Sequence, residues 1–122
     1  MERTWFAAGS LLGFLAVAAG AFGAHALETR LAPERLATWE LAARYQAIHA
    51  LALLALAWAA VHWPRFPDTL AGTLLIGGVL VFSGTLYGLA LGGPRWLGAV
   101  TPIGGLGLLA GWLVMAWGAA RA

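Results

Sequence analysis

YQAIHALALLALAWAAVHW (residues 45–63) is an apolar run that contains no acidic residue, lysine or arginine. As an α-helix these residues would extend for about 28 Å, close to the ~30 Å thickness of the hydrocarbon layer of a bilayer. Backbone N–H and C=O groups in hydrocarbon must bond to one another within the segment, which a single strand cannot do. The run therefore predicts a membrane-spanning helix.

Three further runs share this length and character, at about residues 4–27, 70–91 and 97–120. The chain has 122 residues, of which 61% are hydrophobic and 10% are charged, against about 25% charged residues in a soluble domain. The last two connections are short, so neighbouring spans must be antiparallel. We expect an all-α membrane protein with one domain over residues 1–122, an antiparallel bundle of four transmembrane helices.

The connection between the first two spans is the longest charged segment, LETRLAPERLATWELAAR (27–44). Pro33 suits the first position of a helix, and Glu34 suits its positive amino end. This pattern predicts a short interfacial helix between the first and second spans. No glycine or proline separates Pro33 from Pro64, so this helix can also continue into the second span.

Patches of small and polar residues interrupt the apolar runs at GAFGAH (20–25), YQAIH (45–49), FSGTLY (82–87) and TPIGG (101–105). A chain that crosses the bilayer back and forth brings all four patches to the side opposite the termini. We therefore predict a polar site in that half of the bundle. Its candidate ligand-binding residues are His25, Glu28, Arg44, Tyr45, Gln46, His49, Ser83, Tyr87 and Thr101.

His49 is the candidate with the strongest need for a partner inside the protein. It lies about 7 Å deeper than Arg44 along a helix, so the arginine reaches the headgroups while the imidazole does not. Tyr45 is four residues and Gln46 three residues before His49, so the three side chains neighbour one another on the helix.

Two interpretations of this cluster stay open. The polar groups either join the helices by hydrogen bonds that fix their order, or they bind or conduct a proton, an ion, a small solute or a lipid headgroup. The second role would use His49 and His25 as proton or ligand partners. The first role fits a structural or assembly subunit whose small-residue faces pack against another membrane protein.

Metal, cofactor and catalytic interpretations have less support. His25, His49 and Glu28 lack the spacing of a zinc motif, and a haem held by the two histidines has no further support. Ser83 and His49 as nucleophile and base lack a third residue to orient the histidine. We expect no enzyme activity, no metal and no cofactor.

Charge and cysteine content limit the partners. A formal net charge of +2 and the absence of a basic stripe argue against nucleic acid, and no cysteine is present for thiol chemistry. We expect membrane lipids as partners and leave open a homo-oligomer or another membrane protein. Arginines are nearly balanced between the two sides, and the free amino terminus favours cytoplasmic termini.

Five motifs in order resemble the domain of unknown function 423 family, which includes the animal transmembrane protein 256. They are GAFGAHAL (20–27), YQAIHALALL (45–54), FSGTLYGLAL (82–91), TPIGG (101–105) and GW (111–112). The resemblance implies a four-helix protein of the inner (plasma) membrane without an established activity. It also implies that the family signature includes Pro102 and all the candidate residues except Glu28 and Arg44.

Overall fold

The computed structural model describes all residues, 1–122, and contains helices but no strands. Four helices are long and apolar enough to cross a membrane, which confirms the predicted all-α fold. Their bounds are α1 Glu2–Phe22, continued by a π-helical turn η1 Gly23–Leu27, then α2 Pro33–His62, α3 Asp68–Ala90 and α4 Leu97–Ala120.

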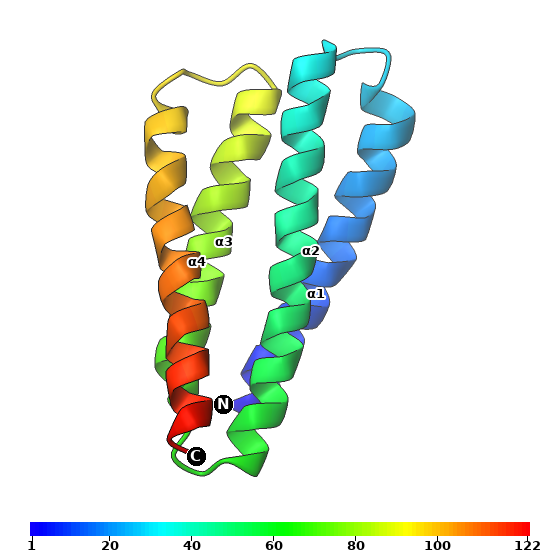
Figure 1. The fold of residues 1–122 in the computed structure, drawn as a ribbon. Helices are drawn as coiled ribbons and strands as arrows, with labels where there is room; N and C mark the ends of the chain where they lie inside the picture. The colour runs from blue at the N-terminus through cyan, green and yellow to red at the C-terminus, as the bar shows by residue number, and fades with distance from the viewer.

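The helices run alternately up and down, so that both termini lie at the same end of the antiparallel bundle (Figure 1). The most extensive contacts join neighbours in the chain: α1 with α2, α2 with α3, and α3 with α4. Each helix therefore packs mainly against the helices next to it in the chain. The two helices with a neighbour on either side, α2 and α3, contain most of the buried residues.

The charged segment after the first span is the beginning of α2. This helix has 30 residues and runs from Pro33 to His62 without a break. The expected interfacial helix is thus continuous with the second span, because no glycine or proline interrupts the backbone hydrogen bonds between them. Pro33 occupies the first turn, as the sequence predicts.

Glycines let α3 and α4 approach closely. A Cβ added at Gly104 would lie 2.8 Å from the carbonyl oxygen of Gly78 and would also strike the backbone of Phe82. A Cβ at Gly78 would lie 2.8 Å from the amide nitrogen of Leu108. Helices in lipid associate mainly through such close packing, because lipid chains are as apolar as the side chains themselves.

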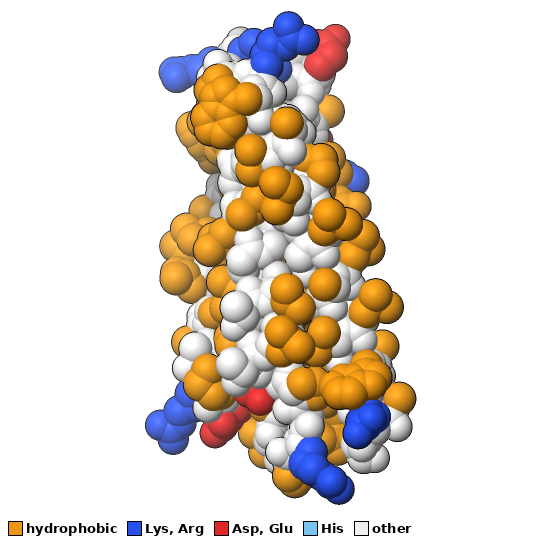
Figure 2. All heavy atoms as spheres, turned by 90° about the vertical axis from the view of Figure 1, so that its left-hand side faces the viewer, with side chains coloured by type: hydrophobic (Ala, Val, Ile, Leu, Met, Phe, Trp, Pro, Cys, Tyr) orange, Lys and Arg blue, Asp and Glu red, His pale blue; other side chains and the backbone are white.

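On the face shown in Figure 2, hydrophobic side chains are spread along the middle of the bundle, and most of the charged side chains lie at its two ends. Large apolar residues such as Val17, Leu51 and Leu113 are more than two-thirds exposed. A surface of this kind is unstable in water over so large an area but is matched to the hydrocarbon of a bilayer. The surface agrees with four membrane-crossing helices.

Candidate functional site

Gln46 joins three helices through its amide. Its Nε2 donates a hydrogen bond to the carbonyl oxygen of Leu12 on α1 at 2.9 Å. The hydroxyl of Tyr87 on α3 donates to its Oε1 at 2.7 Å. The side chain is buried, so both ends of the amide exchange water for partners inside the protein. Gln46 therefore fixes α2 against both of its neighbours.

His49 has a partner on each ring nitrogen. Its Nδ1 lies 2.7 Å from the carbonyl oxygen of Tyr45, and Trp112 of α4 donates from Nε1 to its Nε2 at 3.0 Å. A carbonyl only accepts and an indole N–H only donates. These contacts select the neutral imidazole with its proton on Nδ1. The ring is 3% exposed, and Trp112 is the internal partner that its depth requires.

Two hydroxyl contacts connect α3 to the helices on either side of it. Ser83 of α3 donates to the carbonyl oxygen of Ala42 on α2 at 2.8 Å. The hydroxyl of Thr85, also on α3, lies 2.6 Å from the hydroxyl of Thr101 on α4. No buried side-chain nitrogen or oxygen lacks a hydrogen-bond partner. Each buried polar side chain thus has a partner, in several cases a main-chain oxygen, which avoids the cost of an unpaired polar group in an apolar medium.

Trp39 enters the same half of the bundle from the first turns of α2. Its Nε1 donates to the carbonyl oxygen of Ala19 at 2.8 Å, and its ring meets that of Tyr87 edge-on with centroids 4.6 Å apart. A Cβ at Gly23 would lie 2.7 Å from the Trp39 ring. The π-helical turn begins at this glycine. In such a turn the backbone hydrogen bonds join residues five apart instead of four.

The structure brings some of the predicted residues together and leaves others apart. Gln46 and Tyr87 bond directly, while His49, Ser83 and Thr101 each bond to a neighbouring helix. Tyr45 contributes its carbonyl to His49 and packs its ring on Phe82 with centroids 4.8 Å apart. The remaining predicted residues are exposed, and they are His25, Glu28 and Arg44.

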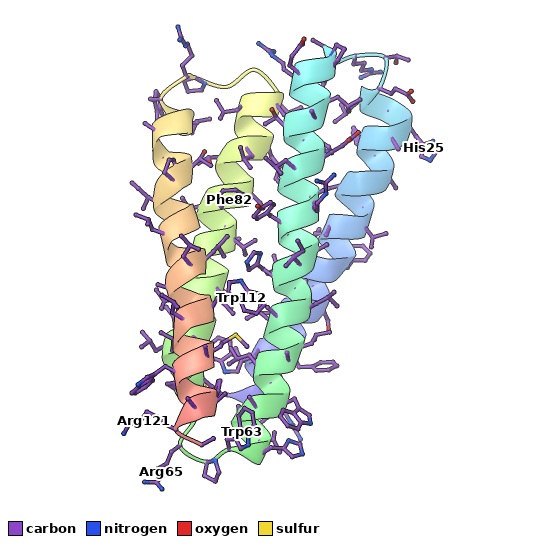
Figure 3. The ribbon with its side chains drawn as sticks, in the orientation of Figure 1. His25, Trp63, Arg65, Phe82, Trp112 and Arg121 are labelled. Carbon is purple, nitrogen blue, oxygen red and sulfur yellow. The ribbon has the colours of Figure 1, made fainter.

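His25 points away from the bundle, whereas Trp112 points from α4 into the space between α4 and α2 (Figure 3). The two histidines named as metal or haem ligands therefore do not face a common point. No group of three or more His, Cys, Asp or Glu side chains is placed to hold a metal ion. Ser83 and His49 likewise bond to different partners, Ala42 and Trp112.

The interhelical hydrogen bonds described above form a polar network. Three of its members are not among the predicted site residues: Trp39, Thr85 and Trp112. Thr85 lies inside the FSGTLY motif and Trp112 inside the GW motif, so the motifs contained the signal. Tryptophan is mostly apolar and carries a single N–H donor, so a search for polar residues does not select it.

A groove between α2 and α4 lies over the His49–Trp112 pair. Its cavity volume is about 700 Å³, and apolar side chains such as Leu106 and Leu109, both more than 60% exposed, form its outer edge. We call this cavity the α2–α4 groove. It is lined by Tyr45, Ile48, His49, Phe82, Pro102, Gly105, Leu106, Leu108, Leu109 and Trp112.

A second, smaller groove lies between α1 and α3 and has a volume of about 310 Å³. Gln46, Ser83 and Tyr87 contribute to its lining, together with Trp39 and apolar side chains of α1 and α3. The polar atoms of this groove are already joined in the network. The α2–α4 groove has the larger volume of the two.

We expect Tyr87→Phe to lower the free energy of unfolding by about 0.5–2 kcal/mol, because it leaves Gln46 Oε1 without its donor. The change is measured by reversible unfolding in mixed micelles. Tyr45→Phe is the matched control, since its ring lies at the surface of α2 and is not a donor in the network. Equal effects of the two variants would contradict a stabilising role for the Tyr87–Gln46 bond.

Comparisons with known proteins place the chain in a family. The DUF423 family, described as a protein of unknown function, matches residues 19–105. A UPF0382 membrane protein of Staphylococcus haemolyticus is 44% identical over 113 residues, covering 88% of this chain and 87% of the relative. The UPF0382 inner membrane protein YgdD of Escherichia coli is 42% identical, covering 92% of this chain and 86% of the relative. No solved structure matches. The chain therefore belongs to the DUF423 (UPF0382) family and is an integral membrane protein.

Proposed function

We propose that this protein binds one lipid-soluble molecule, which enters the α2–α4 groove sideways from the bilayer. The observation that carries the proposal is the groove itself, an apolar cavity of about 700 Å³ with a polar pair inside it. Ligand sites in proteins are typically apolar clefts of roughly 300–1,000 Å³ that contain a few well-placed polar groups. The α2–α4 groove has both properties.

The position of the groove favours a ligand that is dissolved in the membrane. All of its lining residues except Phe82 belong to α2 and α4, both long and apolar enough to span a bilayer. A water-soluble molecule would have to cross hydrocarbon to reach this face, which is costly for polar groups. An acyl or isoprenoid chain is already dissolved in the hydrocarbon layer, and on entering the groove it would gain contact with Ile48, Leu106 and Leu109.

The interior of the bundle supports binding at the groove in preference to conduction through the centre. The buried polar side chains all have hydrogen-bond partners, several of them main-chain oxygens, and a path for ions or water would have to break several of these bonds. Ser83 and His49 bond to Ala42 and Trp112 and not to each other, so the arrangement does not favour nucleophilic catalysis, which requires a hydrogen bond between nucleophile and base.

Filling the groove tests this function. Gly105 lines the groove, and a Cβ there meets only the Phe82 ring, at 3.7 Å, which is ordinary contact. We expect Gly105→Leu to fold normally and to lower the amount of lipid that co-purifies with each chain at least about fivefold, because the added side chain occupies space in the groove that the ligand would otherwise fill. Native mass spectrometry of protein extracted from its own membrane measures the bound lipid.

Gly20→Leu is the matched control for this experiment. It makes the same substitution on the exposed surface of α1, where an added Cβ meets nothing within 4 Å. This variant should retain as much lipid as the wild type. Equal lipid content in the wild type and Gly105→Leu would contradict binding in the α2–α4 groove.

An assembly role is the second candidate function, and a different observation favours it. Gly77 and Gly84 lie seven residues apart on α3, and an added Cβ at either would meet nothing within 4 Å. This spacing puts both glycines on one face, which leaves room for a helix of another chain. Wild-type oligomers that dissociate in Gly77→Leu, with no lipid bound in the α2–α4 groove, would favour assembly over binding.

A further inference from the structure

The bond between Trp112 and His49 borders the α2–α4 groove. The indole is 43% exposed and the imidazole beneath it is 3% exposed. Both residues line the groove, and the indole points into the space between α4 and α2 (Figure 3). A ligand in the groove therefore contacts the more exposed tryptophan more readily, and the imidazole Nε2 lies 3.0 Å from the indole nitrogen.

The hydrogen bonds of this pair define which chemical group can replace it. The Tyr45 carbonyl, 2.7 Å from Nδ1, keeps the imidazole proton on that nitrogen, so Nε2 is an acceptor. The indole Nε1 is a donor and nothing else. A group that separates the two must therefore accept a hydrogen bond from Trp112 and donate one to His49.

Most lipid groups fail this requirement. Ester, ether and ketone oxygens only accept, and an ammonium group only donates, so each would leave either Nε2 or the indole N–H unpaired. An unpaired buried donor or acceptor costs about 1–3 kcal/mol. A hydroxyl meets the requirement, because its oxygen accepts while its proton donates.

We propose that the ligand class of the α2–α4 groove is a lipid with a free hydroxyl, and that this hydroxyl inserts between Trp112 Nε1 and His49 Nε2. This inference rests on the binding function proposed above. An oxygen bonded to both nitrogens requires them to separate from 3.0 Å by roughly 2 Å. The half-exposed indole moves toward the groove to allow this, while the buried imidazole stays on the Tyr45 carbonyl.

The pair lies deep in the bundle. His49 is near the middle of the 30-residue helix α2, and the Trp112 side chain lies near mid-height of the bundle (Figure 3). At this depth in a membrane a hydroxyl has no water to bond with, so the two nitrogens are the partners that satisfy it.

The test compares oleyl alcohol with its methyl ether, two probes with the same chain that differ in the hydroxyl proton. Full-length protein is reconstituted in nanodiscs, and the affinity for each probe is measured by titration. We expect the alcohol to bind about tenfold more tightly than the ether, the ratio that one additional hydrogen bond supplies. In His49→Phe, which removes the acceptor of the hydroxyl proton, the alcohol and the ether can each only accept from Trp112, so this preference should fall to about threefold or less.

A spectroscopic measurement distinguishes insertion from a purely structural role of the pair. The indole ¹⁵N–¹H signal of Trp112, assigned as the one missing in Trp112→Phe, should shift when the alcohol is added and stay in place with the ether. Equal affinity for both probes in the wild type, or an unmoved signal with bound alcohol, would overturn the hydroxyl inference and leave lipid binding intact. Binding of neither probe, with Gly105→Leu retaining its lipid, would overturn both proposals.

Discussion

Replacing Gly104 with alanine is expected to destabilise the protein by at least about 2 kcal/mol. The added Cβ would lie 2.8 Å from the carbonyl oxygen of Gly78 and would strike the backbone of Phe82. Backbone atoms cannot rotate away as a flexible side chain does, so α3 and α4 must separate. This close contact between α3 and α4 would lose its packing, which is the main source of helix association in lipid. Reversible unfolding in mixed micelles, followed by circular dichroism, measures the change.

Gly105→Ala is the control for Gly104→Ala, because the two positions are adjacent on the same helix. A Cβ at Gly105 meets the Phe82 ring at an ordinary distance of 3.7 Å. Alanine also favours a helix over glycine by roughly 1 kcal/mol, so this variant should be as stable as the wild type or slightly more stable. Equal destabilisation by both substitutions would show that the close approach at Gly104 does not control the packing of α3 on α4.

Trp5→Ala should lower the free energy of unfolding by about 3–5 kcal/mol, the usual cost of removing a buried tryptophan. The Trp5 side chain is 4% exposed, and its Nε1 donates to Asp68 Oδ2 at 2.8 Å. Its ring also fills the space beside Gly72, where a Cβ would lie 2.7 Å from Trp5 Cε3. Removing this ring leaves a cavity and an unpaired carboxylate where α1 meets the beginning of α3. The same unfolding measurement applies.

Two companion variants separate the causes of the Trp5→Ala effect. Trp5→Phe keeps much of the ring volume but loses the bond to Asp68. We expect it to lower the free energy of unfolding less than Trp5→Ala does, with about 0.5–1.5 kcal/mol due to the lost hydrogen bond and the rest due to the smaller ring. Trp96→Ala removes a tryptophan that is 64% exposed and should change the stability by no more than about 0.5 kcal/mol. A Trp5→Ala effect as small as that of Trp96→Ala would contradict the proposed anchoring of α1 on α3.

The sequence predicts the depth of each residue in this protein better than the direction of its side chain. Apolar length determines how far along a span a residue lies, so the patches near Gln46 and Tyr87 converge as expected. The direction of a side chain depends on which faces of the helices pack together. Hydrophobic periodicity normally identifies the packed face, but these helices are apolar on all sides and have no such periodicity. His25 illustrates the difference, since it lies near the correct end of the bundle yet points outward. The π-helical turn that contains it also departs from the α-helical spacing by which its direction would be extrapolated.

The tryptophans were missed for a different reason. Trp39 and Trp112 each donate one hydrogen bond from a large apolar ring, and the same residue type is frequent at the surface of membrane proteins. Composition does not tell a tryptophan that anchors a helix from one that faces lipid. Only the neighbouring helix, with the Ala19 carbonyl or the His49 nitrogen in reach, makes the difference.

Three of the interhelical bonds end on main-chain oxygens, those of Leu12, Ala19 and Ala42. Every amino acid carries this oxygen, so substitutions at these acceptor positions leave the bond possible, whereas substitutions of the donors Gln46, Trp39 and Ser83 abolish it. A mutational scan of the protein should therefore detect the loss of such a hydrogen bond at the donor residue and not at the acceptor residue. Sequence drift can alter the acceptor positions wherever the new side chain fits, a condition that is strictest at the fully buried Ala42, and the helices would keep their mutual orientation.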